Sequence, residues 1–184
     1  MKNSFYQISV FFLSFFLFQK SNTPSKVIEL RNPSFEDTPK PSVPPNEWEN
    51  CGCVKETPPD VHPTEGYLCG VLQFAIDGET YVGMVVREND TWESIGQNLS
   101  KPLEKDKCYK FSIYLSRSDI YRSYLLGRKD EVNFTTPIEL RIWGDSGFCK
   151  KSELLAESYL VENTHWEKFT FHISPSQRLS LIHI

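Results

Sequence analysis

Three segments of the chain alternate apolar and polar side chains with a period of two, and this pattern limits the possible folds most strongly. They are residues 109–116, 138–143 and 168–173. Such alternation predicts a strand with one buried and one solvated face. No stretch shows a long helical period. The best helix candidate, residues 152–157, fits equally well a turn that runs into a strand. The pattern therefore predicts an all-β sandwich or barrel.

Further strands are expected on either side of a dense proline region. Residues 71–74 and 81–86 are strand-like, with Asp77-Gly78 as the turn between them, and residues 92–99 form another strand ended by Pro102. Seven prolines between residues 38 and 64 exclude helix interiors and central strands there. This region is expected to be a long surface loop pinned by Trp48 and the cysteines, or alternatively a binding loop.

The amino-terminal segment has the pattern of an export signal. Lys2 precedes an uncharged apolar run over residues 8–18, and eleven residues span only about 16 Å as a helix, against about 30 Å for a bilayer core. We therefore expect a signal peptide over residues 1–20, cleavage within 19–26, and no transmembrane span in the mature chain. The expected location is the periplasm, the outer-membrane surface or the extracellular space. A formal net charge of −4 argues against nucleic acid as a partner.

Five cysteines follow the expected signal peptide: Cys51, Cys53, Cys69, Cys108 and Cys149. In an exported protein they favour disulfides over metal. One expected pair is Cys108–Cys149, and a second joins Cys69 to Cys51 or Cys53, which leaves one thiol over. A zinc site from Cys51, Cys53, His62 and Cys69 is the alternative, but the Cys-x-Cys spacing is tighter than usual for zinc.

The last six residues, 179–184, resemble the peptide obtained when sequencing-adapter DNA is translated. This interpretation excludes them from the fold and sets the domain at residues 27–178. It also predicts that the chain is a fragment, followed in the full-length protein by a further domain.

Several short segments, in this order, carry a family resemblance. They are residues 32–36 (Asn-Pro-Ser-Phe-Glu), 48–52, 80–87, 93–99, 102–103, 108–115 and 166–169. Together they resemble the galactose-binding-like jelly-roll superfamily, which includes many carbohydrate-binding modules. More narrowly, they are similar to amino-terminal domains of exported Bacteroidetes surface proteins that precede an OmpA-like or type IX sorting domain. The resemblance covers about residues 27–173. It implies a two-sheet antiparallel jelly-roll sandwich that here lacks its closing strand.

The resemblance also implies a structural calcium. In many relatives the Glu of the opening motif is a ligand, which corresponds to Glu36. Asp37, the carbonyl of Asn32 and Asp77 could add oxygens, since Ca²⁺ takes six to eight of them. The site would be incomplete without the final strand. The alternative is that Glu36 only caps a turn.

Motifs for catalysis are missing from the sequence: it has no Gly-x-Ser-x-Gly, His-Glu-x-x-His or Gly-rich phosphate loop. We therefore expect a non-catalytic module that binds glycan, with exposed aromatic side chains stacking on sugar rings. The candidates are Trp143, Trp92 and Tyr114, with Tyr121, Arg122 and Tyr124 in the segment 117–124. The alternative for each is core packing or an ordinary surface loop.

Two rival functions remain at this point. The chain could be a structural or adhesion spacer in an envelope protein, without a small ligand, or the targeting module of an enzyme. An exposed row of aromatic side chains would favour glycan binding. Burial of all three of Trp48, Trp92 and Trp143 would favour the spacer.

Overall fold

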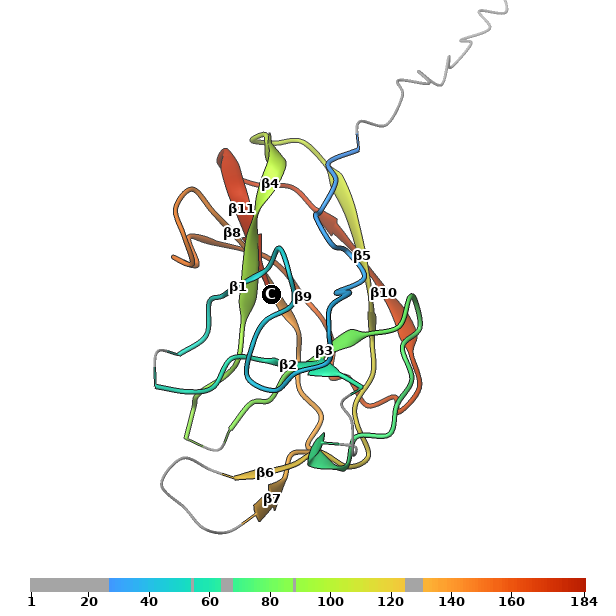
Figure 1. Ribbon diagram of the computed structural model, residues 1–184. Helices are drawn as coiled ribbons and strands as arrows, with labels where there is room; N and C mark the ends of the chain where they lie inside the picture. Colours follow the sequence, from blue (N-terminus) through green and yellow to red (C-terminus); the bar gives the residue numbers. More distant parts are fainter. Residues whose placement is uncertain (1–26, 54, 64–67, 88, 125–130) are drawn as a thin grey trace, which may run out of the picture.

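Antiparallel β-strands make up the regular structure of this chain (Figure 1). The computed structural model describes residues 27–53, 55–63, 68–87, 89–124 and 131–184, so the expected signal peptide and cleavage window lie outside the described residues. The strands are β1 (Glu49–Asn50), β2 (Asp60–His62), β3 (Tyr81–Gly83), β4 (Ile95–Leu103), β5 (Tyr109–Leu115), β6 (Arg122–Tyr124), β7 (Glu131–Asn133), β8 (Arg141–Asp145), β9 (Glu153–Glu157), β10 (Glu167–Ile173) and β11 (Leu179–His183). One 3₁₀ turn, η1, covers Leu68–Gly70. Within the described ranges, no helix is long and apolar enough to cross a membrane.

Among the described residues, the largest sheet has five strands in the order β1-β4-β11-β8-β9, and three two-stranded pairs accompany it: β5 with β10, β2 with β3, and β6 with β7. Each of these pairings is antiparallel. The prediction of an all-β antiparallel fold is therefore confirmed. The longest unbroken ladder joins β5 to β10, from Tyr109 opposite Ile173 to Leu115 opposite Glu167.

The core lies between the five-stranded sheet and the β5–β10 pair, which stand on opposite sides of Figure 1. Ile95, Ile142 and Ile182 face inward from the sheet and are fully or almost fully buried. Phe111 and Phe171 pack against them from the opposite side. Each buried isoleucine stabilises the fold by about 1.5–3 kcal/mol relative to an exposed one. The alternation seen in the sequence therefore marks the core positions correctly.

The expected hairpin of residues 71–74 and 81–86 is wrong. Strand β3 pairs with β2, and residues 71–77 join no sheet. In place of backbone pairing, a side-chain hydrogen bond links the two segments: the Tyr81 hydroxyl donates to the carbonyl of Gln73 at 2.9 Å. Strand β2 lies inside the proline-rich region, bracketed by Pro59 and Pro63. As predicted, that region supplies no central strand, since β1 is at a sheet edge and β2 belongs to a two-stranded pair.

Three further expectations differ from the structure or are narrowed by it. Of the two alternatives for residues 152–157, the strand is the one that forms, as β9 (Glu153–Glu157). Strand β4 runs from Ile95 to Leu103 and so passes through Pro102 instead of ending there. The alternating segment 138–143 enters a strand only at Arg141.

Residues 179–184 were expected to lie outside the fold, but residues 179–183 form a strand inside the largest sheet. Strand β11 pairs with β4 on one side and with β8 on the other. Leu179 and Leu181 are almost completely buried, and Ile184 is bonded to Ile95 through both backbone groups. A short apolar run of this kind suits a strand that is buried on both faces.

Candidate functional site

Two tryptophans from distant parts of the chain form one surface groove. Trp92 precedes β4 and Trp143 lies in β8, and both line a groove of about 450 Å³ together with Lys151. Trp92 is 40 % exposed and Trp143 is half-buried. The Lys151 ammonium lies 4.1 Å from the centre of the Trp92 ring and 6.0 Å from that of Trp143. We call this site the Trp92–Trp143 groove.

Polar and charged groups surround the two indole rings. Glu139 and Arg141 line the same groove. Arg141 is engaged with Glu139 and Glu157. Lys151 makes no ion pair with a carboxylate among the described residues, and its partial burial lowers its pKa. A cation over an indole face gains about 0.5–2 kcal/mol. Its ammonium protons remain free to donate to a ligand oxygen.

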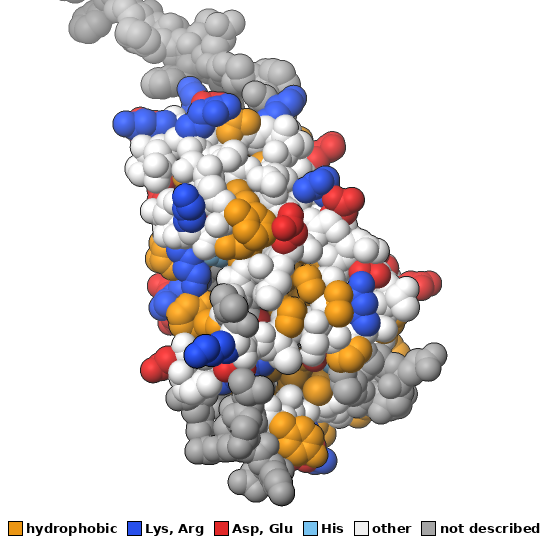
Figure 2. Space-filling model, turned by 60° about the vertical axis from the view of Figure 1, so that its left-hand side comes forward, with side chains coloured by type: hydrophobic (Ala, Val, Ile, Leu, Met, Phe, Trp, Pro, Cys, Tyr) orange, Lys and Arg blue, Asp and Glu red, His pale blue; other side chains and the backbone are white. Residues whose placement is uncertain are grey.

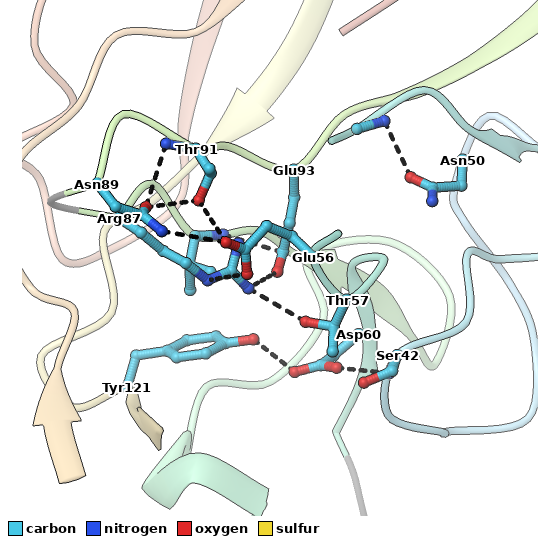
Figure 3. Close-up of polar contacts among 12 residues, drawn as sticks. Ser42, Asn50, Glu56, Thr57, Asp60, Arg87, Asn89, Thr91, Glu93 and Tyr121 are labelled. Carbon is cyan, nitrogen blue, oxygen red and sulfur yellow. Dashed lines mark hydrogen bonds and ion pairs between the residues drawn. The ribbon is translucent and has the colours of Figure 1, made fainter. Parts of the chain in front are cut away.

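A buried ion cluster holds the loop that carries Trp92 (Figure 3). Arg87 is only 7 % exposed, and its guanidinium donates to Glu93 at 2.6 Å and to Thr57 at 3.1 Å. Glu56 lies 3.5 Å from the same guanidinium and accepts from the side chain of Thr91 at 3.0 Å. Bonds from residues 56–57 and from Glu93 thus converge on Arg87 and Thr91, described residues that precede Trp92, and fix these side chains.

Glu93 connects this cluster to the groove. It lines the groove, and its amide donates to the carbonyl of Val85. Burial raises the pKa of Glu93 to about 7, although the Arg87 guanidinium beside it acts in the opposite direction. The desolvation cost of the carboxylate therefore exceeds the attraction of the ion pair.

The loop that carries Lys151 is held by a disulfide. Cys51 bonds to Cys149, with 5.3 Å between their Cα atoms. Asp145 fixes the other end of the loop by accepting from the amide of Ser152 at 2.6 Å. Trp92, Trp143 and Lys151 therefore come from segments that other contacts hold in place. Trp143 is held by its strand, Trp92 by the ion cluster and Lys151 by the disulfide.

This pairing corrects the expected disulfides. Cys108 and Cys149 are not joined, and Cys69 joins neither Cys51 nor Cys53; Cys53, Cys69 and Cys108 are free. The reason is topological: Cys51 follows β1, in the same sheet as β8, whereas Cys108 precedes β5 in the other layer. The disulfide is consistent with an oxidising environment. The disulfide also uses Cys51, one of the four candidate zinc ligands. Burial raises the pKa of Cys69 to about 11, which disfavours the thiolate form that zinc would need.

The remaining ligand-binding candidates do not reach the groove. Tyr114 is 43 % exposed on β5, and Arg122 and Tyr124 are exposed on β6. Tyr121, expected on the surface, is buried, and its hydroxyl donates to Asp60 at 2.6 Å. Its burial results from packing against the ring of His62 in β2, which lies about sixty residues earlier in the chain.

The predicted calcium ligands lie in one loop region but are already engaged. Both carboxylate oxygens of Glu36 accept from the amide of Glu79, and one also accepts from that of Thr80. Asp37 accepts from Lys40 and from backbone amides, and Asp77 accepts from a serine hydroxyl. No group of three His, Cys, Asp or Glu side chains among the described residues could hold a metal ion. These residues therefore do not fit a calcium shell, and Glu36 caps the turn at residues 77–80.

No family model, curated protein or solved structure matches this chain. Its function is therefore argued from the groove itself. The sequence indicated Trp92 and Trp143 as separate candidates. It did not indicate that they lie in one groove, or that Lys151, Arg87 and Glu93 contribute to that site. The short basic pair at residues 150–151 was a weak signal for Lys151. The ion cluster had no local signal, because its members come from two distant segments, residues 56–57 and 87–93.

Proposed function

We propose that this chain is an exported, non-catalytic module of galactose-binding-like jelly-roll type that binds carbohydrate in the Trp92–Trp143 groove. The observation that carries the proposal is the meeting of two accessible indoles with a cation between them. A sugar ring has an apolar face that stacks on indole, and its hydroxyls bond to charged and amide groups beside the ring. Glu139, Arg141 and Lys151 supply such groups.

The fixed positions of these side chains support the same proposal. A binding site gains affinity when its groups need not be ordered at the moment of binding. The ion cluster and the disulfide hold the two loops before any ligand arrives. The disulfide also supports export, since such bonds persist mainly outside the cytoplasm.

The surface pattern favours a small ligand over a large apolar interface. On the face shown in Figure 2, hydrophobic side chains occur in separate groups with charged side chains between them. Of the three tryptophans that distinguish the two hypotheses, only Trp48 is buried, at 5 % exposure. A spacer function without a ligand does not require two accessible indoles in fixed positions.

A glycan array probed with the labelled chain tests the proposal, followed by calorimetric titration of the best ligand. Trp143→Ala and Trp92→Ala should each weaken binding at least tenfold, because aromatic anchors dominate such sites. Tyr124→Ala is the matched control: this tyrosine is 63 % exposed but lies outside the groove. No bound glycan would favour the spacer function, and equal affinities for all three variants would show that the glycan binds outside the groove.

A further inference from the structure

A second and larger cavity, of about 570 Å³, lies beside β5 and adjoins the groove, with which it shares the lining residues Met84, Ile138, Leu140 and Ile184. Its walls come from β3, β5 and the segments 71–77 and 116–121. Its aromatic lining includes Tyr81, Phe111, Tyr121, Phe134 and Trp166. Sites for small molecules have volumes of about 300–1,000 Å³ and mostly apolar walls. This cavity has both properties.

One side chain on its wall has unused hydrogen-bonding groups. His62 is completely buried, and neither of its ring nitrogens has a hydrogen-bond partner among the described residues. Its Nε2 lies 3.8 Å from the Asp60 carboxylate, beyond hydrogen-bonding distance. Burial lowers the pKa of His62, so the ring is neutral and offers one donor and one acceptor. Buried polar groups without partners are rare in folded proteins.

Three other polar side chains on the wall are already paired. The Tyr121 hydroxyl donates to Asp60, and the Tyr81 hydroxyl donates to a backbone carbonyl. Arg117 at the cavity wall donates to the carbonyls of Thr135 and Glu162. The charged side chains on the described wall, Arg117 and Asp77, have opposite signs and existing hydrogen-bond partners, so the wall favours neither an anion nor a cation, whose desolvation would be costly.

The segment 71–77 borders the cavity and carries three exposed apolar side chains. Leu72, Phe74 and Ile76 are 60 %, 81 % and 52 % exposed, and Ile76 also lines the cavity. The segment joins no sheet, and the Trp166 indole donates to the carbonyl of Phe74 at 2.7 Å. An exposed apolar group at a cavity opening is typical of a ligand site.

We propose that this cavity binds a small, uncharged, mainly apolar molecule that carries a hydroxyl group, with His62 as the hydrogen-bond partner of that hydroxyl. The apolar walls select the body of the molecule. The imidazole selects its polar group, because a ligand that lacks a hydrogen-bonding group leaves both nitrogens of His62 unpaired. The two sites adjoin, but this proposal does not rest on glycan binding in the groove.

Two matched probes test the proposal: 2-naphthol, which carries a hydroxyl, and 2-methylnaphthalene, in which a methyl group replaces that hydroxyl. Fluorescence titration of the unchanged chain should give saturable binding, with 2-naphthol about five- to tenfold tighter, as expected for one hydrogen bond. His62→Phe should make the two affinities equal. His172→Phe, an exposed position on β10, should leave the difference unchanged.

A second measurement avoids the risk that the His62 variant fails to fold. In the unchanged chain with ¹⁵N-labelled histidine, 2-naphthol should shift the His62 ring nitrogens and leave those of His172 in place. Absence of saturable binding, equal affinity for both probes in the unchanged chain, or His62 signals that do not move would each overturn the proposal. Loss of glycan binding through the groove would bear on none of these results.

Discussion

The disulfide between Cys51 and Cys149 should contribute a large share of the stability of this chain. It closes a loop with a sequence separation of 98 residues. In the chain-entropy treatment, a loop of about 100 residues stabilises the fold by about 4.7 kcal/mol, and native disulfides in secreted domains commonly contribute about 2–5 kcal/mol. With a urea slope of about 2 kcal/mol per M, breaking the bond should lower the unfolding midpoint by about 1–2.5 M.

Two variants separate this bond from the free thiols. In the first, Cys53, Cys69 and Cys108 are all replaced by Ser, which keeps the disulfide; in the second, Cys51 and Cys149 are replaced by Ser. Urea unfolding followed by fluorescence, with and without a phosphine reductant, gives the midpoints. The reductant should lower the midpoint of the first variant and leave the second unchanged. A first variant whose midpoint is insensitive to the reductant would refute the pairing and the reasoning built on it.

Three other predictions concern single positions. Because burial raises the pKa of Glu93 to about 7, from about 4.5 when unfolded, the folded state holds the proton more tightly. Stability should therefore fall by about 3 kcal/mol as pH rises from 4.5 to 7, and Glu93→Gln should remove that fall in urea titrations. Gly83→Ala should cost about 1–3 kcal/mol, measured by thermal unfolding, because its Cβ would lie 2.7 Å from the His62 ring. Glu36→Ala should cost about 1.5–3 kcal/mol through its lost amide bonds, whereas millimolar Ca²⁺ should leave the melting temperature of the unchanged chain where it is. A Ca²⁺-dependent rise would restore the metal hypothesis.

The features that were predictable from sequence are those with a local signal. The period of two in β5 and β10 depends only on neighbouring residues, so both strands and their buried faces were identified correctly. The outward phase of Trp143 followed in the same way from the buried position of Ile142. Alternation reports which side of a strand faces the core, whatever the strand pairs with.

The predictions that were wrong all depend on contacts between segments that are distant in sequence. Burial of Tyr121 depends on Asp60 and His62, and the pairing of Cys51 with Cys149 depends on Cα separations that a sequence does not contain. The partner of β3 likewise comes from the proline-rich region rather than from its sequence neighbour. Local composition carries no information on any of these choices.

The central claim, that glycan binds between Trp92 and Trp143, is tested most directly by the indole N–H signals of the four tryptophans. Trp48 and Trp166 donate their indole protons to the backbone carbonyls of Asn32 and Phe74, away from the groove. In ¹H–¹⁵N spectra assigned with single Trp→Phe variants, the bound glycan should shift the signals of Trp92 and Trp143 and leave the other two in place. Glycan binding that moves neither groove signal would contradict the claim.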